Sequence, residues 1–307
     1  MRFLNVPLLL IMLLGMPPLT SMSATGQEAR LRVAVSTPLL ADIVQNVAGE
    51  RAEVFSIMPE NAEPHTWEAS PQDIVRVTEA NTFISIGANL EPFVESGGWR
   101  RAVVDGGVSQ LVIADHVELI EVDKVIDHGD HVHDLRAGDP HIWLDPTKVI
   151  EALPAIAGHL SGLDPNGAPE YNVNAATFAT LLTELDAELE ASFAAIPPEQ
   201  RVLVVFHDAY TYFAARYGFE VVGVVVQNPE VEISAQEVVE LQRIIDDRDV
   251  AVIFAEPQFN IEILDIFVDA SGVEVGELLT DAFSGRVVSY IGLMRFNRDS
   301  LVQHLGA

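Results

Sequence analysis

The 307-residue sequence contains no cysteine. This absence excludes disulfide bonds, thiolate metal sites and cysteine nucleophiles, so any bound metal must be held by nitrogen and oxygen donors. It also leaves no thiol to carry a lipid anchor. We therefore expect that the protein is not a lipoprotein.

Basic side chains are scarce. Lys and Arg number 17 against 46 Asp and Glu, which gives a formal net charge of -29. Such a surface repels nucleic acid and anionic membranes and attracts cations, so we expect no nucleic-acid partner. Solubility in a salty medium explains the acidity equally well, and composition alone leaves both explanations open.

The N-terminal apolar run, Val6 to Met16, is too short to span a membrane. It follows Met1-Arg2 and precedes small residues from Ser21 to Ala24, which is the layout of a secretory signal peptide. We expect residues 1–24 to be removed on export, and a monomer to act in a periplasm-like compartment. The hydrophobic content of 49% supports folded cores in the remainder.

That remainder alternates between predicted strands and helices, the pattern of parallel sheets covered by helices. The first series has strands over 31–36, 52–58 and 83–86, a helix over 39–47, a second helix opening at Ser70-Pro71, and a third over 146–160. The second series has strands over 202–206, 221–226 and 250–255, with helices over 209–217, 234–246, 261–270 and 290–305. We expect an α/β fold with two parallel-sheet lobes.

One long helix is predicted between the two series. Over residues 169–195 apolar side chains recur at three- and four-residue intervals, with Thr, Glu and Asp on the outward face. At 1.5 Å per residue the helix spans about 40 Å, the length of a domain. We expect an N-terminal α/β lobe over 25–165, a rigid connecting helix over 166–197, and a C-terminal α/β lobe over 198–307.

Several metal-ligating residue types stand where predicted strands give way to loops, and ligands of parallel sheets gather beyond the carboxyl ends of strands. Taken singly, a histidine or aspartate in such a place is more often structural, and only the set is informative. Three imidazoles and one carboxylate form a four-coordinate set that suits zinc. The four residues are His65, His141, His207 and Asp281.

A second group of histidines lies in the polar segment Asp127 to Asp134, which contains His128, His131 and His133. Flexible His/Asp loops bind metals loosely, and a solvated loop without a metal role is an even alternative. Our hypothesis is that these histidines raise the local zinc concentration or bind a second, weaker ion.

Five short motifs occur in order along the chain. They are Pro64-His65 with Trp67-Glu68-Ala-Ser-Pro71, Asp139-Pro-His141-Ile-Trp-Leu-Asp145-Pro146, Phe206-His207-Asp-Ala-Tyr210, Glu256-Pro-Gln258-Phe259 and Thr280-Asp281. In these motifs the sequence resembles the extracytoplasmic zinc and manganese solute-binding proteins of ABC importers. The resemblance implies two lobes joined by one rigid helix, a metal in the cleft between them, and delivery to a membrane permease.

The family pattern also implies the ligands. It gives His65, His141, His207 and Asp281 as the metal-binding residues, and Glu63 as a nearby acid that some zinc members use instead of the fourth. Manganese-type relatives commonly have a carboxylate at the position of His207, whereas imidazole favours zinc over the harder manganese ion. A His/Asp loop before the second ligand motif is also typical of zinc receptors. We expect zinc, with manganese as the alternative, although copper or nickel would also bind the purified protein.

Two functions of other classes stay open at this point. A secreted zinc hydrolase would keep one coordination position for water and place a carboxylate base beside it, a role open to Glu63 or Glu256. The chain has no His-Glu-x-x-His motif, and we expect no enzyme. A metal-binding adhesin is the third class. We interpret Glu256 as a structural residue near the cleft.

Overall fold

The computed structural model describes residues 30–121, 125–127, 132–134, 138–226, 233–285 and 287–306. The expected signal peptide, residues 1–24, and two of the loop histidines, His128 and His131, lie outside the described residues. His133 is described only as part of the backbone of strand β6. In these ranges no helix is long and apolar enough to cross a membrane.

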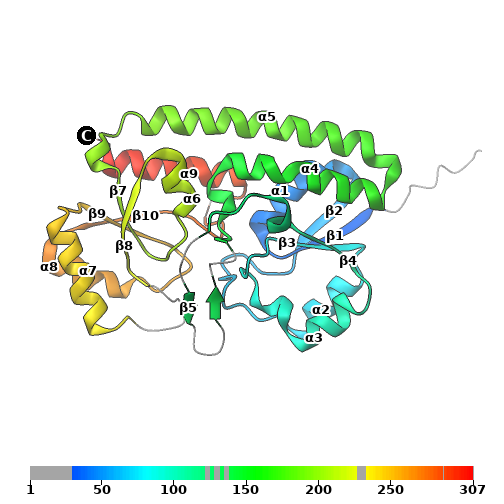
Figure 1. The fold of residues 1–307 in the computed structure, drawn as a ribbon, viewed down its shortest axis with the longest axis horizontal. Helices are drawn as coiled ribbons and strands as arrows, with labels where there is room; N and C mark the ends of the chain where they lie inside the picture. Colours follow the sequence, from blue (N-terminus) through cyan, green and yellow to red (C-terminus); the bar gives the residue numbers. More distant parts are fainter. Residues whose placement is uncertain are drawn as a thin grey trace, which may run out of the picture.

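The N-terminal lobe is a four-stranded parallel sheet with helices on both faces (Figure 1). Its strand order is β2-β1-β3-β4, built from β1 (Leu31–Val35), β2 (Ala52–Ser56), β3 (Thr82–Ser85) and β4 (Ser109–Val112). The helices are α1 (Pro38–Ala48), α2 (Pro71–Thr78), the single turn α3 (Gly97–Trp99) and α4 (Pro146–Leu163). Because side chains alternate along a strand, Val33 and Val35 pack toward α1 and α4, while Ala34 packs on the opposite face with Val77 and Trp99.

The C-terminal lobe repeats this design. Its parallel strands follow the order β10-β9-β7-β8, and they are β7 (Val202–Val205), β8 (Glu220–Val224), β9 (Val252–Ala255) and β10 (Glu274–Glu277). The helices are α6 (Thr211–Tyr217), α7 (Ala235–Asp247), α8 (Asp265–Ser271) and α9 (Tyr290–Leu305). A short antiparallel pair, β5 (Val125–Asp127) and β6 (Val132–Asp134), lies apart from both sheets.

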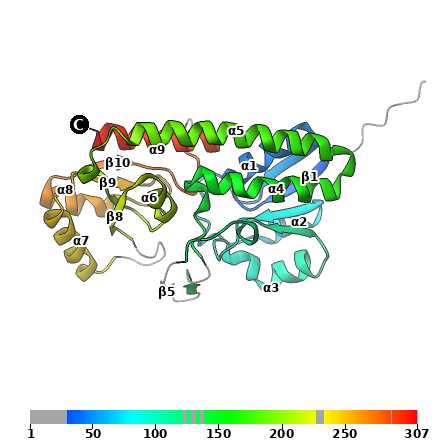
Figure 2. The same cartoon turned by 45° about the horizontal axis from the view of Figure 1, so that its top comes forward.

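Helix α5 (Ala168–Phe193) runs along both lobes, as Figures 1 and 2 show. It packs on α1 and α4 of the first lobe and on α9 of the second. One continuous apolar core therefore extends under α5 from the first sheet to the second. The predicted α/β fold, with two parallel sheets and a long helix, is confirmed; the lobe boundaries at 165 and 197 stay predictions.

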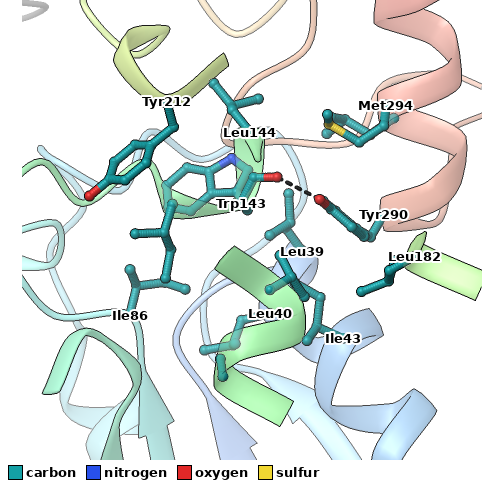
Figure 3. Close-up of a cluster of buried hydrophobic side chains, with 14 of the residues drawn as sticks. Leu39, Leu40, Ile43, Ile86, Trp143, Leu144, Leu182, Tyr212, Tyr290 and Met294 are labelled. Atoms are coloured by element: carbon teal, nitrogen blue, oxygen red, sulfur yellow. Dashed lines mark hydrogen bonds between the residues drawn. The ribbon is translucent and has the colours of Figure 1, made fainter. Parts of the chain in front are cut away.

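Trp143 lies where the two lobes meet (Figure 3). Its 3-10 turn, Ile142–Leu144, packs among Leu39 and Leu40 of α1, Leu182 of α5, and Tyr212, Tyr290 and Met294 of the second lobe. The hydroxyl of Tyr290 donates a hydrogen bond of 2.7 Å to the carbonyl of Trp143. This segment is thus fixed by both lobes before the chain enters α4.

Four of the described strands were not predicted from the sequence. Two of them, β5 and β6, form the short separate pair, and the other two, β4 and β10, are edges of the large sheets. In β10 only Gly276 is buried, so the strand lacks the apolar run that identifies a central strand. The predicted helix over 261–270 is also shorter than expected, because a 3-10 turn, Glu262–Leu264, precedes α8.

Two side chains of α5 do not have the burial that the predicted apolar stripe implies. Leu181, expected inside, is 44% exposed, whereas Asp186, expected on the outward face, is buried. Asp186 accepts two hydrogen bonds from the Arg216 guanidinium and one of 3.0 Å from the Tyr217 hydroxyl. This ion pair ties α6, the helix that follows His207, to α5.

Replacing Asp186 with Asn should lower the free energy of unfolding by about 2 kcal/mol, because the Arg216 guanidinium then keeps only the exposed and more distant Glu190 as a charged partner. Urea unfolding followed by circular dichroism measures this change. The matched control is Glu184→Gln on the exposed side of the same helix. Equal stability of the two variants would contradict a structural role for the pair.

Candidate metal centre

His65 is delivered by a turn that follows β2. The backbone N–H of His65 donates to Oε1 of Glu63 at 3.1 Å, and the N–H of Trp67 donates to the carbonyl of Glu63 at 3.0 Å. The Trp67 ring packs edge-on against Phe93 of the first lobe. The His65 side chain is 4% exposed, so this turn holds it inside the molecule.

His141 is oriented by Asp139. One carboxylate oxygen, Oδ1, accepts both the backbone N–H of His141 at 2.9 Å and its ring Nδ1–H at 2.8 Å. Burial alone would raise the pKa of Asp139, but the charge and hydrogen bonds of His141 outweigh it and hold the pKa below its ordinary value. With Nδ1 engaged, only Nε2 of His141 can face a metal.

His207 lies two residues beyond the end of β7, and Glu256 directly follows the neighbouring strand β9. Nδ1 of His207 lies 2.6 Å from Oε1 of Glu256. Burial alone would lower the pKa of His207, but the adjacent Glu256 carboxylate outweighs it and raises that pKa to about 10 in the metal-free protein. Nε2 of His207 lies 3.3 Å from Oδ2 of Asp281, whose own pKa is raised by burial.

These four side chains converge on one point. One donor atom from each of His65, His141, His207 and Asp281 lies within 4.8 Å of the other three, and all four side chains are buried. Nε2 of His65 is 3.3 Å from Nε2 of His141, the same separation as between His207 and Asp281. Tetrahedral zinc with bonds of about 2.0 to 2.2 Å holds its donors about 3.3 to 3.6 Å apart. The spacing of these two pairs therefore suits a tetrahedral divalent metal ion.

Glu63 faces the same point. Its Oε1 lies 3.9 Å from Nε2 of His65, and its Oε2 is buried without a hydrogen-bond partner among the described residues. Burial, followed by the nearby charge of Asp281, raises the pKa of Glu63 to about 8. Glu63 thus offers a further oxygen donor beside the set of four.

The buried carboxylates around these imidazoles have no Lys or Arg among the described residues as ion-pair partners. Four carboxylates lie within or beside the set, and within the described ranges their only ion-pair partners are histidines, with no Lys or Arg in range. They are Glu63, Asp139, Glu256 and Asp281. Buried negative charge is costly unless protons or a cation neutralise it. The raised pKa values of Glu63 and His207 show that protons do so in the metal-free protein, and a divalent metal can take their place.

The four predicted residues lie together in the structure, and Glu256 pairs with one of them, in agreement with a structural role near the site. The contact partners of Asp139 and Glu256 were not predicted. Asp139 was noticed only as part of a motif, and Glu256 was interpreted as a structural residue near the cleft. Both contact a ring nitrogen of a candidate ligand. Position in the chain could have indicated both residues. Asp139 lies two residues before His141, and Glu256 follows a strand that neighbours the strand before His207.

The family model described as zinc-uptake complex component A, periplasmic, matches residues 33–304. This chain belongs to that family. Its members are periplasmic metal-binding components of ABC metal importers, so the chain is a solute-binding protein and not an enzyme, and it acts outside the cytoplasm with a membrane permease. The resemblance inferred from the motifs is confirmed.

Named relatives differ in their metals. The chain is 31% identical to the manganese-binding lipoprotein MntA of Halalkalibacterium halodurans over 279 residues, covering 90% of this chain and 88% of the relative. It is 29% identical to the iron-binding protein YfeA of Yersinia pestis over 286 residues, 90% of this chain and 87% of that protein. The structure of the periplasmic zinc-binding protein TroA from Treponema pallidum matches with a TM-score of 0.77 and 26% identity, covering 91% of this chain and all of that chain. The family binds divalent metals, and these names do not select one.

A divalent transition metal should stabilise the protein by about 2.7 kcal/mol at a hundredfold excess over Kd. The stabilisation should grow as pH rises through neutrality, because a metal must displace the proton that His207 holds with a pKa of about 10. Thermal unfolding with and without metal, at several pH values, measures both effects. Magnesium at equal concentration is the control, since it prefers oxygen donors. Stabilisation that weakens with rising pH would contradict ligation by imidazole.

Proposed function

We propose that this chain captures zinc between His65, His141, His207 and Asp281 and delivers it to an ABC-transporter permease for import. The observation that carries the proposal is the convergence of four buried donors within 4.8 Å, three of them imidazoles. His65 and His141 precede α5 in the chain, while His207 and Asp281 follow it. Separating the two lobes would part these pairs, which is a simple route to metal release at the permease.

Zinc is favoured over manganese by the chemical kind of the donors. Imidazole nitrogen suits zinc, whereas manganese favours carboxylate, carbonyl and water oxygens. The third imidazole, His207, supports zinc, whereas the 3.3 Å spacing of the two donor pairs suits a divalent metal in general. Against zinc stand the manganese-binding relative and Glu63, which could add a second hard oxygen. Manganese therefore remains the alternative cargo.

The anchor and the assembly state are part of the proposal. Relatives such as MntA are named lipoproteins, which conflicts with our expectation for this chain. The absence of cysteine supports a protein without a thioether-linked lipid, released by cleavage of a signal peptide. We propose a monomer, because the set of four donors is completed by side chains of one chain.

Replacing His141 with Ala should reduce zinc affinity by more than about 100-fold, since loss of a ligand costs more than loss of an outer-shell partner. Chelator competition measures the affinity. The control is His116→Ala, an exposed histidine outside the set. In the same assay wild-type protein should prefer zinc to manganese. Unchanged zinc affinity of His141→Ala would show that the donor set is wrong.

His207→Glu tests the choice of metal. Exchanging an imidazole for a carboxylate should shift the ratio of zinc to manganese affinity toward manganese by roughly tenfold or more, about 1.4 kcal/mol. Paired titrations with the two metals give this ratio. A ratio that stays the same would mean that this position does not select the ion.

A further inference from the structure

Glu256 and His207 are brought side by side by the register of two central strands. Val205 of β7 pairs with Phe254 of β9, and extending this parallel register by two residues places His207 beside Glu256. The Glu256 side chain is 1% exposed. It contacts no Lys or Arg in the described ranges, so its hydrogen bonds define its role.

Both oxygens of Glu256 are occupied by donors. Oε1 accepts from His207, and Oε2 accepts from the Gln258 amide at 2.9 Å and from the Thr280 hydroxyl. An ionised carboxylate only accepts hydrogen bonds, so Nδ1 of His207 carries the hydrogen. Nε2 then faces Asp281 at 3.3 Å, and it can present a lone pair to a metal once the metal has displaced its proton.

Thr280 connects Glu256 to Asp281, the next residue in the chain and a proposed metal ligand. Its hydroxyl donates to Glu256, and its backbone carbonyl accepts from the indole N–H of Trp143 at 3.0 Å. The residue is fully buried. With both its side chain and its carbonyl held, Thr280 fixes the backbone from which Asp281 projects.

We propose that Glu256 and Thr280 act as one positioning pair that orients two donors at once, His207 directly and Asp281 through the chain. This inference rests on the proposed function, because it takes those two residues as metal ligands. Neither Glu256 nor Thr280 touches the metal. Replacing a residue that hydrogen-bonds a metal ligand typically lowers metal affinity by about 10- to 100-fold.

Two variants test the pair. Glu256→Gln keeps the shape and removes the charge, and Thr280→Val keeps the shape and removes the hydroxyl. Each should lower zinc affinity by about 10- to 100-fold. Thr280→Ser restores the hydroxyl and should return affinity to near the wild-type value. The control is Glu262→Gln, an exposed acid of the same lobe.

The double variant and a spectroscopic probe distinguish positioning from loss of folding. If the two residues act as one unit, the double variant should bind zinc no more weakly than the worse single variant. Visible spectra of the cobalt-loaded proteins should change in Glu256→Gln and Thr280→Val and be restored in Thr280→Ser. Unfolding of the metal-free variants shows that they remain folded.

The proposal is overturned if both single variants retain wild-type zinc affinity and cobalt spectra, or if their losses add in the double variant. This failure is separate from failure of the proposed function. Loss of zinc binding in His141→Ala with normal binding in Glu256→Gln and Thr280→Val would keep the donor set and reject the pair. Normal zinc binding in His141→Ala would reject the donor set itself.

Discussion

The structure depends on a concentration of buried carboxylates between the two lobes. Four carboxylates surround three imidazoles there, and no Lys or Arg of the described chain reaches them. Buried carboxylates are stable inside a protein only when hydrogen-bond donors, protons or a cation compensate for the lost water. The donors are provided by histidine rings and loop amides, and the remaining charge is suited to a divalent metal ion.

The carboxylates divide into two kinds. Asp139 and Glu256 each hold the Nδ1 side of a histidine and leave the opposite nitrogen toward the centre. Asp281 and Glu63 face the centre themselves, each with a buried oxygen that has no hydrogen-bond partner among the described residues. In our proposal the first kind orients the donors before the metal binds, and the second contributes negative charge to the metal. Such preorganisation lowers the cost of binding.

The sequence predicts the parts of the fold that local patterns determine. Central strands such as β7 are continuous apolar runs, and α5 has an apolar stripe, so both were found. The edge strand β10 was not, because it is mostly exposed and polar. The four converging residues were found through strand ends and family motifs. The contact of Glu256 with His207 was missed, because it joins residues 49 positions apart through the register of β7 and β9.

X-ray absorption spectroscopy of protein isolated from its own compartment, without added metal, tests the central claim most directly. The absorption edge identifies the ion, and the fine structure counts its neighbours. We expect zinc with histidine nitrogens at about 2.0 to 2.1 Å, at least one carboxylate oxygen, and no sulfur. A manganese edge with an oxygen-dominated, six-coordinate shell would contradict the assignment of zinc. Zinc without histidine neighbours would contradict the site itself.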